Sequence, residues 1–239
     1  MHKVEQLRRQ RLQESSKPFL ARGSKLKRCD NCQLGKDHCI CQQLKKDHSH
    51  CDLILIMHRN ELLKPSNSGR LIADTLPDNT HAYIWSRTEP EPELLALLNQ
   101  SNRQCLLVFP PKDDDPQESL NSLAVKENLA SEWRDKKTTL IMLDGTWKQA
   151  RKMHAKSDYL KSIPILLLCE QDIANCAGKY AMRRAHAPSL SSTCEAAIIA
   201  LNAIGEQQAS QTLQQNFTHF NNAYVASRGN IRPKIKVKN

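Results

Sequence analysis

This 239-residue chain has few aromatic side chains, and it has neither a long apolar run nor internal repeats. Aromatics make up 5% of the residues and hydrophobic residues 39%, so we expect one sizeable core of mainly aliphatic side chains, with room for a small accessory unit. No apolar run approaches the length of a membrane span, and residues 1–11 contain no apolar segment like that of a signal peptide. We therefore expect a soluble, cytoplasmic protein without a membrane partner.

The nine cysteines are an odd number in a chain expected to be cytoplasmic, where disulfides are rare. Scattered cysteines in such a protein pack in the core, whereas clustered ones indicate a metal or catalysis. The arrangement of the cysteines is therefore more informative than their number.

Positive charge is concentrated at the two ends of the chain. Residues 1–28 hold nine Lys/Arg and two Glu, and residues 227–239 hold five Lys/Arg and no acid. These ends carry +7 and +5 of a net charge of +10, so the residues between them sum to −2. Basic arms on a nearly neutral body favour a polyanionic partner such as a nucleic acid, although they can also simply keep a protein soluble.

Alternating strand and helix patterns predict an α/β fold with a mostly parallel sheet, preceded by a small metal-binding unit. We expect three parts: an arm and cysteine unit (1–50), a catalytic body (51–226) and a basic tail (227–239). Predicted strands are 51–58, 81–87, 105–110, 138–144 and 163–169. Predicted helices are 2–14, one within 64–76 capped by Asn67 or Ser68, 91–100, 146–157, 191–206 with a Ser192/Glu195 capping box, and 210–226.

Four cysteines fall within thirteen residues in the pattern C-x2-C-x6-C-x-C. The segment lacks the apolar residues that core thiols need, so four thiolates around one tetrahedral ion are favoured. Zinc is the expected metal, and an iron–sulfur cluster is an alternative whose common spacings match less well. With four protein ligands the zinc is predicted to be structural. The ligands are Cys29, Cys32, Cys39 and Cys41, with His38, His48, His50 and Cys51 as possible substitutes.

The stretch LIMLDGTWKQARKM (140–153) combines a strand, a tight turn and a helix. Ligands of open α/β sheets bind at the carboxyl ends of strands, so Asp144 is well placed to act as a base or to bind a cation. Trp147 can stack on a base or face a cation. The alternative is structural: Asp144 or Thr146 caps the helix, and Trp147 belongs to its buried face.

Several blocks of the sequence resemble the DTW-domain proteins, the tRNA-uridine aminocarboxypropyltransferases. The turn DGTW is similar to their D-x-T-W signature, and residues 58–72 and 179–201 resemble their H-x-x-E…N-[T/S]-G-R-L and R-R…L-S-T-x-E-A blocks. The cysteine cluster is similar to that of bacterial members, and the resemblance runs from about 29 to 205. Ser68 and Arg59 depart from the usual threonine and proline, and neither change removes a group assigned to chemistry.

The resemblance implies a SPOUT-like fold with a carboxy-terminal knot. It also implies transfer of the 3-amino-3-carboxypropyl group of S-adenosylmethionine to N3 of a tRNA uridine, with release of methylthioadenosine. S-adenosylmethionine is then the co-substrate, zinc the structural metal and tRNA the partner, and no DNA is expected. Uridine N3 must lose its proton to attack, and a carboxylate at a strand end can accept it.

The implied site consists of residues from each block. Asp144 is expected to be the base or to bind the ammonium group of the co-substrate, and Trp147 to pack against the co-substrate or the target base. Asn67 and Ser192 can alternatively serve only as helix caps. The co-substrate is expected at Asn67, Ser68, Gly69, Leu143, Gly145, Thr146, Ser191, Ser192 and Thr193. RNA phosphates or the carboxylate of the co-substrate are expected at Arg70, Arg183 and Arg184, and RNA phosphates at Lys148 and Arg151.

Two other functions remain open from the sequence. An RNA methyltransferase needs the same pocket but presents a different carbon of S-adenosylmethionine. A non-enzymatic RNA-binding zinc protein needs only the cysteine unit and the basic arms. Neither the tRNA species nor the uridine position follows from the residues.

Overall fold

The structure is a computed structural model, and it describes residues 1–15, 26–110, 117–168, 170, 172 and 192–229. The strands are β1 (Asp52–Met57), β2 (Thr80–Ile84), β3 (Arg103–Val108), β4 (Ser119–Asn121), β5 (Lys137–Asp144) and β6 (Ile165–Leu167). The α-helices are α1 (Lys3–Gln13), α2 (Arg70–Thr75), α3 (Pro92–Leu98), α4 (Ser122–Ala130), α5 (Trp147–Ala155), α7 (Thr193–Ala203) and α8 (Gln207–Gly229). Two short 3-10 turns are η1 (Lys36–His38) and η2 (Asp158–Leu160).

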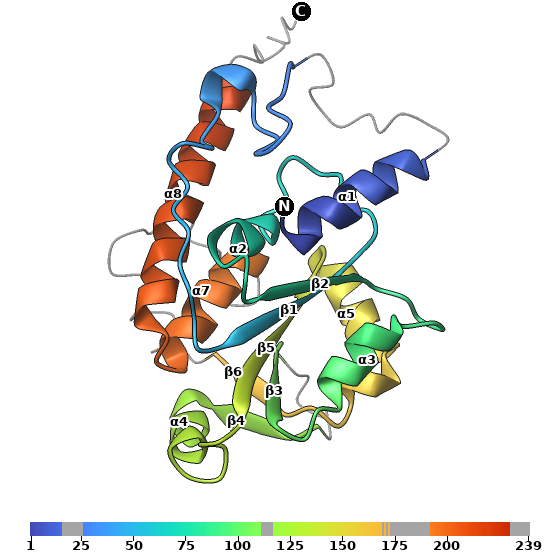
Figure 1. Cartoon of the computed structure of the whole chain (residues 1–239), viewed down its shortest axis with the longest axis vertical. Helices are drawn as coiled ribbons and strands as arrows, with labels where there is room; N and C mark the ends of the chain where they lie inside the picture. The colour runs from blue at the N-terminus through green and yellow to red at the C-terminus, as the bar shows by residue number, and fades with distance from the viewer. Residues whose placement is uncertain (16–25, 111–116, 169, 171, 173–191, 230–239) are drawn as a thin grey trace, which may run out of the picture.

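The strands form one six-stranded sheet in the order β2-β1-β5-β3-β6-β4, and every pairing is parallel. The central strands are apolar on both faces: all six residues of β1 are buried, as are the last six of β5. Such continuous apolar runs are what a parallel sheet covered on both faces requires. The predicted α/β class and parallel sheet are confirmed, and Figure 1 shows the strands enclosed by helices.

All five predicted strands are present, most of them shorter than predicted. β2 ends at Ile84 instead of residue 87, and β6 covers Ile165–Leu167 instead of 163–169. The edge strand β4 and the helix α4 were not predicted. Because β4 has three residues and its outer two are exposed, it carries no apolar pattern. The side chain of Asn121 caps α4 by accepting a hydrogen bond from the amide of Ala124 at 2.9 Å.

Two hydrophobic clusters lie on the two faces of the sheet. One includes Leu53, Leu55 and Met57 of β1 together with apolar residues of α1, α2, α7 and α8. The other includes Ile54 and Ile56 of β1 with residues of α3 and α5. The predicted buried helix is confirmed, because α7 buries seven side chains and begins with the predicted Ser192/Glu195 capping box.

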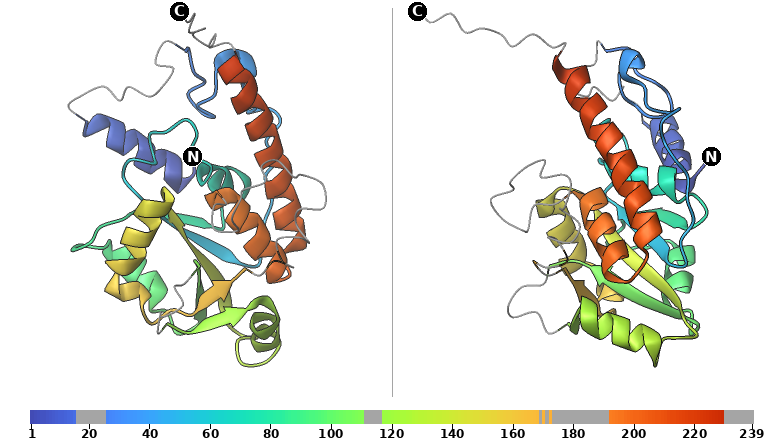
Figure 2. Two further views of the ribbon diagram at one scale, coloured as in Figure 1. Left: turned by 180° about the vertical axis from the view of Figure 1, so that it is seen from behind. Right: turned by 90° about the vertical axis from the view of Figure 1, so that its left-hand side faces the viewer.

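The amino-terminal segments pack on the body. Val4 and Leu7 of α1, and Leu34 and Ile40 of the cysteine segment, belong to the same cluster as the inner residues of β1. Figure 2 shows the cysteine segment beside the carboxy-terminal end of α8, which contacts η1. The predicted boundary at residue 50 therefore marks where the sheet begins, while the packing continues across it.

Some predictions fall outside the described residues. The path of 173–191 decides whether the chain is knotted, and these residues are among those not described, as are 16–25, 111–116 and 230–239. Within the described part, no helix combines the length and the apolar character needed to cross a membrane.

Basic side chains surround one carboxylate at the amino ends of the central strands. Asp52 is buried and accepts a hydrogen bond from Arg103 at 2.8 Å and from Asn79 at 3.2 Å, while Lys137 lies 3.3 Å away. Burial alone would raise the pKa of Asp52, but contacts with His81, Arg103 and Asn79 and the charge of Lys137 lower it well below its usual range. The folded state therefore favours the ionised form of Asp52. Its contacts with Arg103 and Lys137 link β1 to β3 and β5.

Replacing Asp52 by Asn should lower the free energy of unfolding at pH 7 by about 2 kcal/mol or more, because Arg103 loses its buried counter-charge. A depressed pKa stabilises the fold fully above the unfolded value near 4, and this contribution is lost progressively as the pH falls from that value toward the much lower folded one. Denaturant unfolding of both proteins from pH 7 to pH 3 measures the difference, which should shrink in acid.

Asp78→Asn is the matched control. Asp78 is exposed, and its contact with the exposed imidazole of His48 spans 3.8 Å, so its loss should change stability little. Equal effects of the two substitutions would refute the role given to Asp52.

Candidate functional site

Asp144 is the last residue of β5 and is 3% exposed. Its carboxylate accepts a hydrogen bond from the Asn67 side-chain amide at 2.6 Å and from the Thr193 hydroxyl at 2.7 Å. Its carbonyl oxygen accepts the amide of His58 at 2.8 Å. Three segments far apart in the sequence therefore meet at this buried acid: the loop after β1, the end of β5 and the start of α7.

The environment of Asp144 opposes its ionisation. Burial raises the pKa of this carboxyl to about 6, although the hydrogen bonds from Thr193 and Asn67 act in the other direction. The negative charge of Glu61 adds to the increase, and Lys64 offsets part of it. Asp144 thus changes charge close to neutral pH, unlike Asp52 at the other end of the sheet.

Gly69 lets the loop between β1 and α2 lie directly against Asp144. A Cβ atom at Gly69 would sit 2.7 Å from the carboxylate, closer than any real contact, so only glycine fits. The side chain of Asn67, next to it, also accepts the Arg70 amide at 2.8 Å and so caps α2. Ser68 extends the contact, because its hydroxyl lies 3.5 Å from the amide of Cys194 in α7. The loop is thereby held between β5 and α7.

Helix α5 begins with a capping box. The Thr146 hydroxyl accepts the Gln149 amide, and the Gln149 side chain accepts the Thr146 amide in return. The predicted alternative, that Thr146 caps this helix, is therefore confirmed. Gln149 also bonds to Nδ1 of His58 at 3.1 Å, which ties the start of α5 to the end of β1.

Trp147 is partly exposed at the start of α5. Its indole stacks on Phe109 with ring centroids 5.8 Å apart, and the guanidinium of Arg151 lies 4.9 Å from the ring centre. Ala150 and Met153 form the buried side of α5, while Lys148 and Arg151 are exposed on its outer side. The two predicted RNA-binding residues of α5 are therefore accessible.

The four predicted metal ligands converge. The sulfur atoms of Cys29, Cys32, Cys39 and Cys41 all lie within 4.8 Å of one another, and three of their separations are 3.5, 3.6 and 3.8 Å. Tetrahedral zinc with Zn–S bonds of about 2.3 Å places its sulfurs about 3.8 Å apart. The arrangement fits a structural zinc ion held by four thiolates.

The surroundings of Cys29 also suit a metal-binding thiolate. Burial acts to raise the pKa of this thiol, but hydrogen bonds from the backbone amides of Cys32 and Asn31 and from the thiols of Cys39 and Cys41 together lower that pKa to about 7. The turn between the first two cysteines and Leu34 closes with Gln33 at a φ of +61° and with the Cys29 amide bonded to the Leu34 carbonyl at 2.8 Å. Four sulfurs this close repel one another as thiolates unless a cation lies between them.

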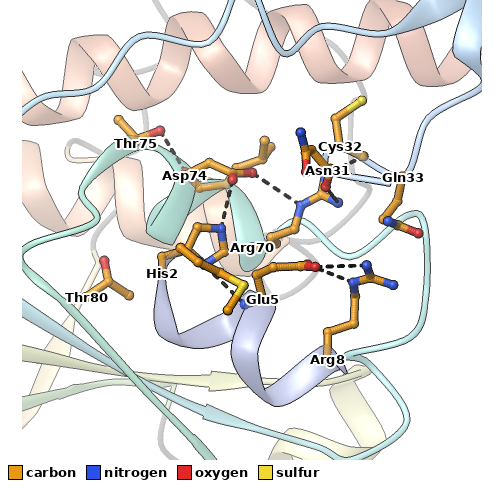
Figure 3. A network of polar contacts seen from close by, with 12 residues as sticks. His2, Glu5, Arg8, Asn31, Cys32, Gln33, Arg70, Asp74, Thr75 and Thr80 are labelled. Carbon is orange, nitrogen blue, oxygen red and sulfur yellow. Dashed lines mark hydrogen bonds and ion pairs between the residues drawn. The ribbon is translucent and has the colours of Figure 1, made fainter. Parts of the chain in front are cut away.

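The structure corrects the prediction that Arg70 contacts RNA or the co-substrate. Arg70 is 4% exposed, and its guanidinium donates to the carbonyls of Cys32 at 2.6 Å and Asn31 at 3.2 Å. Its Nε lies 3.3 Å from Asp74, which in turn contacts His2 of the amino-terminal segment (Figure 3). Arg70 therefore fastens the cysteine turn to α2, because its two terminal nitrogens donate to carbonyls of that turn and its Nε lies within ion-pair distance of Asp74.

The structure brings most of the predicted co-substrate residues together. The loop 67–69, the strand end at Leu143, the turn 145–146 and the start of α7 at Ser192 and Thr193 all lie around Asp144. Ser192 and Asn67 both cap helices, and Asn67 additionally binds Asp144. Ser191, Arg183 and Arg184 lie outside the described residues.

Two side chains at this edge were not assigned a role from the sequence. His58 directly follows β1, and Gln149 lies within α5, yet they bond to each other beside Asp144. Their positions at strand ends could have indicated them. Met57 of β1 pairs with Asp144 of β5, so the residues that follow these two strands lie at the same edge of the sheet.

Comparison with known proteins identifies one family. A family model described as the DTW domain matches residues 26–225, which is most of the chain. The match is consistent with an enzyme that modifies tRNA. No solved structure matches the chain.

Asp144→Asn should stabilise the protein at pH 8, because its amide oxygen can accept from Asn67 and its amide nitrogen can donate to the Thr193 hydroxyl without burying a charge. A raised pKa makes the wild type lose stability as the pH rises from about 4 to about 6, by roughly 2–3 kcal/mol in all. Unfolding curves across this range should show that loss in the wild type and not in the variant. A variant that is less stable than the wild type at pH 8 would contradict the assignment.

Arg70→Met should weaken zinc binding by about tenfold or more, the usual effect of losing a contact that orients metal ligands. Competition with a chromophoric chelator measures the affinity. Arg28→Met is the control, since Arg28 is only partly buried and donates to the Gln33 carbonyl of the same segment. Similar losses of zinc affinity in both variants would show that the contact between Arg70 and the cysteine turn contributes no more than the local contact of Arg28.

Proposed function

Because the chain belongs to the DTW-domain family, we propose that it transfers the 3-amino-3-carboxypropyl group of S-adenosylmethionine to N3 of a uridine in tRNA. The observation that carries the proposal is the convergence of three segments on Asp144 at the carboxyl edge of a parallel sheet. This edge is where α/β sheets bind small ligands. Each of the three segments also contains one of the sequence blocks by which the chain resembles the family.

The residues around Asp144 suit a positively charged co-substrate. A buried carboxylate whose pKa is raised is relieved when a cation approaches it, and S-adenosylmethionine carries both a sulfonium and an ammonium group. The amino end of α7, at Ser192 and Thr193, favours a carboxylate such as that of the amino-acid moiety. The same edge therefore offers complementary charge for both ends of this group.

Asp144 acts in this proposal as a positioning residue. Both of its oxygens accept hydrogen bonds from the protein, and Gly69 covers the carboxylate, so the acid holds the 67–69 loop and the start of α7 at a fixed spacing. A proton acceptor for uridine N3 would need an exposed oxygen within hydrogen-bond reach. The predicted alternative of a binding role, exerted through the charge of Asp144, thus agrees better with the geometry than a role as base.

S-adenosylmethionine supplies the electrophilic carbon, and the protein decides which of its three activated carbons meets the nucleophile. The fixed spacing of the three segments supplies that selection, because a displacement of about 1 Å is enough to change a transfer reaction substantially. Zinc at the four cysteines takes no part in the reaction, and its role is to maintain the turn that Arg70 holds against α2.

The test is mass spectrometry of tRNA and of the small-molecule product after incubation with S-adenosylmethionine and unmodified tRNA. A uridine heavier by one aminocarboxypropyl group, together with methylthioadenosine, supports the proposal. S-adenosylhomocysteine with a methyl-sized gain would identify a methyltransferase instead, and no gain on any tRNA would leave a binding protein.

Asp144→Asn and Thr193→Val separate positioning from proton transfer. If Asp144 positions the loops, Thr193→Val raises the KM for S-adenosylmethionine by about tenfold. Asp144→Asn can still accept from Asn67 and can donate to the Thr193 hydroxyl, so it raises this KM only through the lost charge attraction. If Asp144 is the base, Asp144→Asn lowers kcat by about a hundredfold or more and leaves that KM unchanged.

A further inference from the structure

Aromatic rings follow four neighbouring strands at the edge that contains Asp144. Trp85 comes directly after β2, His58 after β1 and Phe109 after β3, and Trp147 lies three residues beyond the end of β5. The sheet order β2-β1-β5-β3 places them in a row. Trp85, His58 and Trp147 are each partly exposed, in a chain with only 5% aromatic residues.

Trp85 and His58 form a stacked pair with a fixed orientation. Their ring centroids are 6.3 Å apart and their planes differ by 20°. The indole N–H of Trp85 donates to the buried hydroxyl of Ser157 at 2.9 Å, and its backbone amide donates to the Met57 carbonyl at 2.9 Å. The side-chain amide of Gln149 is hydrogen-bonded to Nδ1 of His58. The pair is therefore preorganised, which lowers the entropy lost when a flat ligand binds.

Positive charges from two segments, the loop after β1 and helix α5, lie around this pair. Burial and the charges of Lys64, Lys152 and Arg59 lower the pKa of His58, and Glu61 acts in the other direction. Arg59 and Lys152 are exposed. The lowered pKa favours the neutral imidazole, while the exposed side chains of Arg59 and Lys152 are accessible to anions.

We propose that Trp85 and His58 form the platform on which a base of the RNA substrate stacks, with Arg59 and Lys152 binding the adjacent phosphates. Single-stranded RNA is recognised by this combination of aromatic rings for bases and cations for the backbone. The adenine of S-adenosylmethionine is a poorer fit, because that molecule has no phosphate for Arg59 and Lys152 to bind. The proposal rests on the function proposed above, and it specifies where the RNA is held.

Binding of unmodified tRNA transcripts, measured by fluorescence anisotropy without S-adenosylmethionine, tests the platform. Trp85→Ala should weaken tRNA binding by about tenfold, the effect of losing one stacked base, and Trp85→Phe should restore most of it. Affinity for S-adenosylmethionine, measured by calorimetry, should stay unchanged in both. Far-UV circular dichroism and thermal midpoints establish that the variants are folded.

The charged part of the platform is tested by salt dependence. Lys152→Ala should make the slope of log affinity against log salt shallower by about 0.7–0.9, the value for one phosphate contact. Lys126→Ala is the matched control, because Lys126 is an exposed lysine of α4, which lies beside the edge strand β4. Equal slopes for the two variants would overturn the phosphate contact.

The outcomes separate this proposal from the proposed reaction. If Trp85→Ala binds tRNA as tightly as the wild type, or loses affinity for S-adenosylmethionine instead, the platform is refuted even when aminocarboxypropyl transfer is observed. If Trp85→Ala loses tRNA affinity and Trp85→Phe regains it, the platform stands even when no transfer product forms. A wild type that does not bind tRNA refutes the platform outright.

Discussion

The hydrogen bonds of one buried carboxylate hold this edge of the molecule together. Asp144 accepts from Asn67 and Thr193, which lie 77 and 49 residues away in the sequence, and no hydrophobic contact could set the spacing of these polar loops as narrowly. The cost is a charge that burial disfavours. Asp52, at the amino ends of the same strands, is surrounded by cations and favours its ionised form. The sheet thus has one end adapted for stability and one end that retains unfavourable electrostatics, as functional sites commonly do.

A second set of contacts connects this edge to the cysteine unit. Asn67 binds Asp144 and caps α2 through the Arg70 amide, and the Arg70 guanidinium binds the carbonyls of Asn31 and Cys32. Arg70 therefore links the two sites directly: its backbone amide binds the loop that covers Asp144, and its guanidinium binds the cysteine turn. The amino-terminal unit consequently helps to hold the loop at Asp144 in place. It shares a hydrophobic core with β1 and is therefore packed as part of the same body.

The sequence was sufficient for features that depend on local pattern. Apolar runs predicted five strands, cysteine spacing predicted the metal ligands, and the Ser192/Glu195 pair predicted the start of α7. It was insufficient where tertiary partners decide: Arg70 looks like a surface cation until the carbonyls that occupy it are known, and β4 has too few buried residues to leave a pattern. The pairing of Trp85 with His58 was missed for the same reason, because 27 positions separate two residues that the parallel register of β1 and β2 brings together.

Net charge conceals the electrostatic organisation of the body. Residues 29–226 sum to −2, which suggests a neutral domain served by two basic arms. At the carboxyl edge, however, Arg59 and Lys152 flank the His58 ring, whereas at the amino edge the cations Arg103 and Lys137 are engaged by Asp52. Arg59 and Lys152 are exposed, so they offer positive charge to a polyanion beside the buried acid and the aromatic row. A field of this kind draws a phosphate backbone toward the same edge where a small cationic ligand would be stabilised, and the two ligands need not compete, because each meets charges of the opposite sign.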